Sequence, residues 1–125
     1  FKTSKGEFIE PLGLEKFFGD IVEFEQICIV GLGNPQPMLL VVLSESGKST
    51  DKNTLKSMIE NKLVAVNKDL VSYKRISTII FVKDDWNPEN EILTPTMKIK
   101  RNKINDKYHG KFKDWSDNKE TVIWE

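Results

Sequence analysis

Hydrophobic residues occur along this chain in three short runs that predict strands. Residues 26–30 and 38–43 are β-branched and aliphatic runs, and residues 76–82 form the third. The glycine- and proline-containing cluster at residues 31–35 predicts that the first two strands form a hairpin with a rather long loop. Because both of these runs are almost continuously apolar, we expect one or both strands to be covered on two faces.

The strongest helical pattern lies between the second and third runs. Its apolar residues recur at steps of three and four, namely Leu55, Met58, Ile59, Leu63, Val66 and Leu70. Ser49, Thr50 or Asp51 supplies the N-cap oxygen. Shorter helices are expected over about 14–21 and 100–108, and the polar residues 84–95 predict an exposed loop. The order predicts an α+β fold, with a small sheet of about three core strands, a short N-terminal hairpin and helices packed on the sheet.

Length and composition favour one domain, residues 1–125, with 38% apolar residues. The single cysteine, Cys28, excludes an internal disulfide framework, and its apolar neighbours predict a buried, inert thiol in a reducing, intracellular setting. The longest apolar run has six residues, against about 20 for a membrane span. The chain opens with neither a signal peptide nor a methionine, so we expect a piece of a longer protein.

The 19 basic and 19 acidic side chains are unevenly distributed. Residues 7–25 hold six acidic residues and one basic residue, whereas residues 98–113 hold seven basic residues and one acidic residue. The basic stretch fits a binding face for nucleic acid or anionic lipid, a solvated helix face, or a surface that docks on the acidic segment. Composition favours the solvated face.

Two nucleotide-binding motifs are incomplete. Gly47-Lys48-Ser49 follows a strand like the end of a phosphate-binding loop, but Val42 stands where the first glycine is required. Gly31-x-Gly33 begins a dinucleotide fingerprint, but Gln36 occupies its third glycine position. We therefore interpret both as turns.

Metal and nucleophile chemistry also lacks support. The acidic residues of the 84–91 region do not have the spacing of a calcium loop, so a solvated acidic loop is expected. His109 is the only histidine and is expected at the surface. The three tryptophans lie outside the periodic elements, as packing anchors or partner contacts: Trp86, Trp115 and Trp124.

Two segments remain unexplained by packing alone. Residues 2–11 read Lys2-Thr3-Ser4-Lys5-Gly6-Glu7-Phe8-Ile9-Glu10-Pro11, a polar turn whose glycine permits positive φ and a close backbone approach. Residues 93–101 read Leu93-Thr94-Pro95-Thr96-Met97-Lys98-Ile99-Lys100-Arg101. There Pro95 stiffens a loop, and Lys98 can extend a point charge toward a phosphate or carboxylate.

Together these segments resemble the C-terminal domain of the adenylate-forming enzymes, and more specifically the long-chain fatty acid–CoA ligases. That family has a Lys-Thr-Ser-x-Gly-Glu-x-x-x-Pro stretch after the interdomain hinge and a Leu-Thr-Pro-Thr-x-Lys-x-Lys-Arg stretch near its C-terminus. Residues 26–37 and the Val-Ile-Trp-Glu ending at 122–125 also fit. The resemblance therefore spans nearly the whole chain.

The resemblance implies roles for individual residues. Lys98 matches the catalytic lysine that bridges the acyl carboxylate and the ATP α-phosphate, with Lys100 as the alternative. Gly6, with Lys5 and Glu7, matches the loop that lines the pantetheine channel of CoA during thioester formation. Lys2 matches a lysine of the second half-reaction, with a one-residue shift against some relatives.

One position departs from the pattern of the wider superfamily. Many relatives outside the long-chain group have glycine directly before the catalytic lysine, where this chain has Met97.

The resemblance also implies a parent enzyme with two domains. This chain is its C-terminal lid, and an N-terminal adenylation domain binds ATP, Mg²⁺ and the fatty acid, with CoA as the second substrate. The expected location is cytoplasmic or peripheral at a membrane, with no nucleic-acid partner. The lid alone is expected to bind no cofactor and to be inactive. A relative that transfers the acyl group to a carrier protein has the same residues, so the acceptor stays open.

Overall fold

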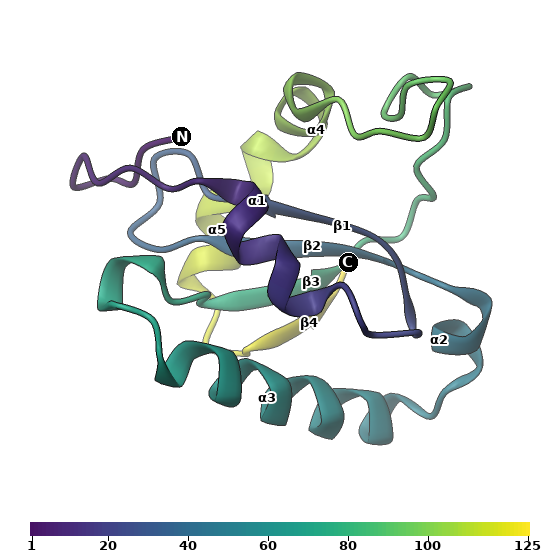
Figure 1. The fold of residues 1–125 in the computed structure, drawn as a ribbon, viewed down its shortest axis with the longest axis horizontal. Coiled ribbons are helices and arrows are strands. Elements are labelled where there is room, and N and C mark those ends of the chain that lie inside the picture. Colours follow the sequence, from purple (N-terminus) through teal and green to yellow (C-terminus); the bar gives the residue numbers. More distant parts are fainter.

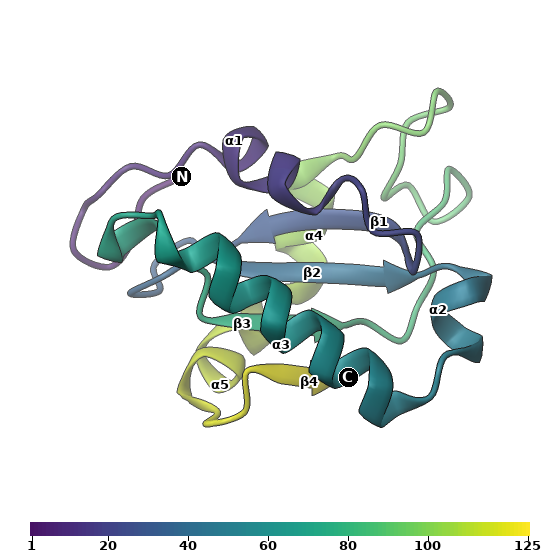
Figure 2. The ribbon, with the colours of Figure 1, turned by 60° about the horizontal axis from the view of Figure 1, so that its bottom comes forward.

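A four-stranded mixed sheet runs through the computed structural model, which describes residues 1–125. The strands are β1 (Phe24–Val30), β2 (Met38–Leu43), β3 (Thr78–Phe81) and β4 (Val122–Trp124), in that spatial order (Figures 1 and 2). β1 pairs antiparallel with β2, and the β2–β3 and β3–β4 pairs are parallel. The α+β class and the β1–β2 hairpin are confirmed.

Helices cover both faces of the sheet. One face carries α1 (Pro11–Glu15) with its 3₁₀ extension Lys16–Phe18, and also α3 (Lys52–Lys68). The other carries α4 (Arg101–Tyr108), a 3₁₀ turn at His109–Lys111, and α5 (Phe112–Asp117). The connections include α2 (Glu45–Ser49) and a 3₁₀ turn at Ser72–Lys74. No helix combines the length and the apolar character needed to cross a bilayer.

Alternate residues of the strands enter two separate cores. Leu39 and Val41 pack toward α1 and α3, whereas Met38 and Leu40 pack toward α4 and α5, and all four are fully buried. This two-sided burial confirms the expectation drawn from the continuous apolar runs.

The long helix agrees with its predicted stripe in most positions. Asp51 is the N-cap, with its carboxylate accepting from the Thr54 amide at 3.1 Å. Four of the predicted residues are buried, whereas Met58 lies at the border of the stripe and is exposed. The helix ends at Lys68, two residues before the last residue of the predicted stripe.

The short N-terminal hairpin is present, closed by the antiparallel Lys2–Phe8 bridge. Three local expectations are corrected. The helix expected over 14–21 begins at Pro11, because proline at the first helical position has the required φ. β4 is a fourth strand of three residues, which the sequence pattern did not predict. The 84–95 loop is only partly exposed, because it buries Trp86, Ile92 and Leu93.

A tight hairpin spans residues 93–99. The Leu93–Ile99 bridge closes it, the Met97 amide donates to the Thr94 carbonyl at 2.8 Å, and the Thr94 amide donates to the Lys98 carbonyl at 2.7 Å. Met97 has φ +68°. This is the pattern of a turn followed by a left-handed residue, a place that normally favours glycine. Met97 therefore adopts a backbone conformation that normally favours glycine.

The first prediction concerns Gly47 in α2. A Cβ at this position would overlap the Glu23 carbonyl oxygen, so the glycine permits close backbone packing. We expect Gly47→Ala to lower the free energy of unfolding by about 1–3 kcal/mol, measured by chemical denaturation. The matched control is Gly13→Ala in α1, where a Cβ meets nothing within 4 Å. A Gly47 variant as stable as this control would contradict the packing argument.

The second prediction concerns the left-handed conformation of Met97. Met97→Gly removes a steric cost of about 1–2 kcal/mol, partly offset by the larger chain entropy of glycine. We expect the unfolding free energy to rise by about 0.5 kcal/mol, and Met97→Val to lower it because a β-branched residue fits this region worse. Equal stability of the glycine and valine variants would disprove the strain.

Candidate functional site

Lys98 lies on the 93–99 hairpin, and its backbone is held by the loop itself. Its amide donates to the Thr94 hydroxyl at 3.0 Å, and the Thr94 and Thr96 hydroxyls lie 3.1 Å apart. The side chain is exposed and makes no hydrogen bond or ion pair in the structure. The hairpin thus presents one flexible cation from an ordered backbone.

Most of the basic stretch 98–113 is neutralised within the fold. Five of its seven basic side chains form ion pairs: Arg101 with Glu15, Lys103 with Glu91, Lys107 with Asp84, Lys111 with Glu125, and Lys113 with Asp117. The other two are Lys98 and Lys100. Only Arg101 pairs with the acidic segment 7–25. The basic stretch is therefore a set of individual pairs, with its free charge at the hairpin end.

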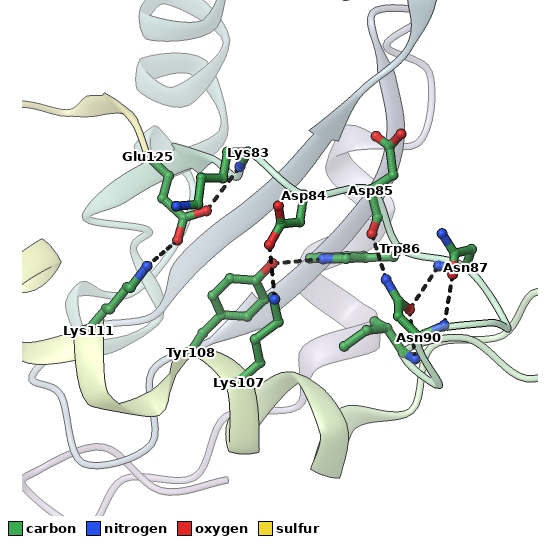
Figure 3. Close-up of polar contacts among 11 residues, drawn as sticks. Lys83, Asp84, Asp85, Trp86, Asn87, Asn90, Lys107, Tyr108, Lys111 and Glu125 are labelled. Atoms are coloured by element: carbon green, nitrogen blue, oxygen red, sulfur yellow. Dashed lines mark hydrogen bonds and ion pairs between the residues drawn. The ribbon is translucent and has the colours of Figure 1, made fainter.

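A polar network anchors the segment that leads into the hairpin (Figure 3). The Trp86 indole donates to the Tyr108 hydroxyl at 3.0 Å, and Lys107 contacts Asp84 at 3.0 Å. Burial is the main reason why the pKa of Tyr108 is raised to about 12, so this hydroxyl stays protonated. Because Tyr108 and Lys107 belong to α4, the segment before the hairpin and the helix after it are joined.

The turn that begins at Asn87 is held by side-chain amides. The Asn90 amide nitrogen donates to the Asp85 carbonyl at 2.9 Å, and the Asn87 side-chain oxygen accepts from the Asn90 backbone at 2.9 Å (Figure 3). Lys48 contacts Asp85 at 3.5 Å. Asp84 and Asp85 thus act as exposed lysine partners, which agrees with a solvated acidic loop.

Gly6 lies in a loop that the 31–36 turn supports. The Gly6 amide donates to the Thr3 carbonyl at 3.0 Å, and Gly6 has φ +80°. The Ser4 amide donates to the Asn34 carbonyl at 2.8 Å, and the Gly33 amide donates to the Lys2 carbonyl at 3.1 Å. Supporting this loop is therefore one role of the turn that looked like the start of a dinucleotide motif.

The side chains around Gly6 point mostly to solvent. Lys2 and Lys5 are exposed and Glu7 is half-buried, and none of the three forms an ion pair. The loop offers a free backbone surface, because a Cβ at position 6 meets nothing within 4 Å.

The two candidate segments lie at opposite ends of the molecule. In both ribbon views the purple N-terminal loop is at one end of the long axis, and the green segment before α4 extends at the other (Figures 1 and 2). The structure therefore does not bring Lys98 and Gly6 into one site. It places the two candidate segments apart on one domain.

Other residues considered from the sequence have structural roles. Cys28 is buried, and burial raises the pKa of its thiol to about 12, so it is an inert thiol as predicted. His109 is exposed. Trp86 and Trp115 are buried in the α4–α5 core, and Trp124 packs on Phe81 with ring centroids 5.0 Å apart. All three tryptophans thus contribute packing.

Glu15 was missed by the sequence analysis. Its carboxylate forms a two-point ion pair with Arg101, which is 86 residues away along the chain. No local pattern distinguishes this glutamate from its acidic neighbours, so only the folded structure identifies it.

Comparison with known proteins identifies the family of this chain. Residues 2–119 match the family described as "AMP-binding enzyme C-terminal domain". The long-chain-fatty-acid–[acyl-carrier-protein] ligase AEE15, chloroplastic, of Arabidopsis thaliana is 28% identical over 110 residues, covering 84% of this chain and 15% of that protein.

Solved structures give the same fold. The A-PCP didomain of carboxylic acid reductase from Segniliparus rugosus, in complex with AMP, has a TM-score of 0.72 at 26% identity, covering 91% of this chain and 17% of that one. The adenylation domain of the carboxylate reductase from Mycobacterium chelonae has a TM-score of 0.73 at 22% identity, covering 94% and 19%.

The chain thus spans less than a fifth of each of these relatives. The family match itself covers nearly all of this chain. The chain therefore belongs to the AMP-binding enzyme C-terminal domain family, the C-terminal domain of adenylate-forming enzymes.

Proposed function

We propose that this chain is the C-terminal lid of a two-domain long-chain fatty acid–CoA ligase. The parent transfers the AMP group of ATP to the carboxylate of a fatty acid with release of pyrophosphate, and then transfers the acyl group to the thiol of CoA with release of AMP. The lid supplies Lys98 to the first step and the Gly6 loop to the second. The N-terminal adenylation domain of the parent supplies the sites for ATP, Mg²⁺ and the acyl chain.

The observation that carries this proposal is the unpaired Lys98 at an ordered hairpin. In the first step a carboxylate oxygen attacks the α-phosphorus, so two anions approach each other and negative charge accumulates on the phosphate oxygens. A cation aimed at that charge stabilises the transition state more than the separated substrates. The paired lysines of α4, α5 and the 3₁₀ turn between them are less suited to this task, because their charges are already neutralised by carboxylates.

The separation of the two loops supports alternation between two positions. The N-terminal loop and the 93–99 hairpin lie at opposite ends of the domain (Figures 1 and 2), so we do not expect one orientation of the domain to direct both at one catalytic centre. A rigid-body rotation about a hinge presents them in turn. The continuous sheet and two cores give the domain the rigidity that such a rotation needs.

A separate part of the proposal concerns the thiol that accepts the acyl group. The Arabidopsis relative is named as a ligase for acyl carrier protein, and we propose CoA here because the Lys-Thr-Ser-x-Gly-Glu stretch resembles the CoA ligases. Assays with CoA and with acyl carrier protein as alternative thiols distinguish the two. Thioester formation on the carrier protein alone would replace CoA in the proposal and leave the lid mechanism unchanged.

The third prediction tests Lys98 in the full-length parent. We expect Lys98→Ala to reduce fatty-acid-dependent ATP–pyrophosphate exchange by at least about 10²-fold, as for removal of a transition-state charge partner. Thioester formation from preformed acyl-adenylate should stay within about twofold of wild type. Lys113→Ala is the matched control, because it removes an exposed lysine that is paired with Asp117.

Three outcomes contradict parts of this assignment. Unchanged exchange in Lys98→Ala together with a loss in Lys100→Ala transfers the role to Lys100. Absence of exchange with every fatty acid in the wild-type parent contradicts the ligase. Fatty-acid-dependent ATP turnover by residues 1–125 alone contradicts the expectation that the lid is inactive by itself.

The fourth prediction tests the Gly6 loop by the opposite selectivity. Gly6→Val places a branched side chain at φ +80°, which a β-branched residue rarely adopts. It also adds side-chain bulk to the exposed surface of the loop. We expect thioester formation from preformed acyl-adenylate to fall by about tenfold or more, while exchange stays within about twofold. Gly110→Val, at a glycine whose φ is not positive, is the control. Equal losses in both half-reactions would contradict a role confined to the second step.

A further inference from the structure

Glu15 and Arg101 form a two-point ion pair in which both carboxylate oxygens and both terminal guanidinium nitrogens take part. The Arg101 guanidinium donates from Nη2 to Glu15 Oε1 at 2.8 Å and from Nη1 to Glu15 Oε2 at 2.9 Å. Glu15 Oε2 also accepts from the Ile29 amide at 2.8 Å. The glutamate side chain is only 12% exposed. Such a fork-to-fork pair fixes direction as well as distance.

The pair joins three elements at one point. Glu15 ends α1, Ile29 belongs to the outer strand β1, and Arg101 is the first residue of α4. The Ile29 amide is bonded to Glu15 on the free edge of the sheet, so the carboxylate satisfies a donor that no strand pairs. The start of α4 is thereby tied to the sheet through α1.

No residue next to the start of α4 stabilises it by capping or by charge. Lys100 is the N-cap of α4 and makes no side-chain capping bond, and the first turn contains no acidic residue. An arginine at the first helical position is electrostatically unfavourable near the positive end of the helix dipole. The Glu15 carboxylate offsets that charge and supplies the negative partner that the helix start lacks.

Lys98 lies three positions before Arg101 in the chain. The Lys100 amide donates to the Ile92 carbonyl at 2.8 Å, and the Leu93–Ile99 bridge closes the hairpin just before it. The orientation of the hairpin therefore follows from where α4 begins. The polar network at the other end of α4 holds the segment before the hairpin, but its ion pairs are exposed.

We infer that Glu15 and Arg101 are positioning residues for Lys98 in the adenylation step. This inference rests on the proposed function and adds a determinant that lies outside both loops. The pair touches no substrate. It sets the direction from which the hairpin delivers the lysine, and misplacement of a catalytic group by about 1 Å can cost about 10²-fold in rate.

The fifth prediction uses Glu15→Gln in the full-length parent. Glutamine keeps the size of the side chain but removes the charge that holds the guanidinium fork. We expect kcat of ATP–pyrophosphate exchange to fall by about tenfold to a hundredfold, and thioester formation from preformed acyl-adenylate to stay within about twofold. The second reaction uses the Gly6 loop, so it reports whether the lid is folded and can rotate.

Arg101→Lys is the second variant, because lysine keeps the positive charge but cannot form both bonds of the fork. It should show the same split between the two half-reactions. The double variant Glu15→Gln/Arg101→Gln should lose no more than the worse single variant, since both remove one interaction. Lys113→Gln is the matched control, because it breaks an exposed ion pair that lies within α5 and does not touch the hairpin, and it should leave both reactions unchanged.

The inference and the proposed function fail in different ways. Loss of exchange in Lys98→Ala, with full exchange in Glu15→Gln and Arg101→Lys, overturns positioning and leaves the lid mechanism standing. Parallel loss of both half-reactions in Glu15→Gln and Arg101→Lys, with a lower melting temperature, also overturns positioning, because the pair then only stabilises the fold. Full exchange in Lys98→Ala itself contradicts the proposed role of Lys98.

Discussion

Burial of β2 on both faces is the constraint on which the rest of this domain depends. Four successive residues of the strand, Met38 to Val41, have no exposed surface. An apolar strand of this kind must be covered twice, and the chain does so with α1 and α3 on one side and α4 and α5 on the other. The helical segment that covers the second face contains most of the basic stretch, and the hairpin with Lys98 leads directly into α4. The position of Lys98 therefore depends on the packing of a core that it does not enter.

The same architecture holds the two candidate segments apart on one small domain. The sheet separates the N-terminal loop from the 93–99 hairpin, and both are attached to it through short, hydrogen-bonded connections. A rigid body that holds two different groups far apart is suited to presenting them in succession to a site on another domain.

Several residues that resembled parts of nucleotide-binding motifs in the sequence have packing or turn-forming roles in the structure. Gly47 allows α2 to approach the Glu23 carbonyl, and Gly33 has φ +81° in the turn that holds the N-terminal loop. Conversely, Glu15 looked like one acid among six and forms the two-point pair beside the Lys98 hairpin. Charge counts along the chain could not anticipate this, because ion pairs depend on which surfaces meet in three dimensions.

The sequence alone determined the three main strands, the long helix with a cap among residues 49–51, the α+β class and the two segments that resemble the adenylate-forming enzymes. These features depend on local periodicity, on capping chemistry and on contiguous motifs, all of which act within a few residues. The tertiary structure decided the fourth strand, the burial of Trp86, Ile92 and Leu93, and the pairing of Arg101 with Glu15. It also decided that five basic residues are neutralised while Lys98 stays free. These features arise from contacts between residues far apart in the chain, and such contacts leave no periodic signal in the sequence.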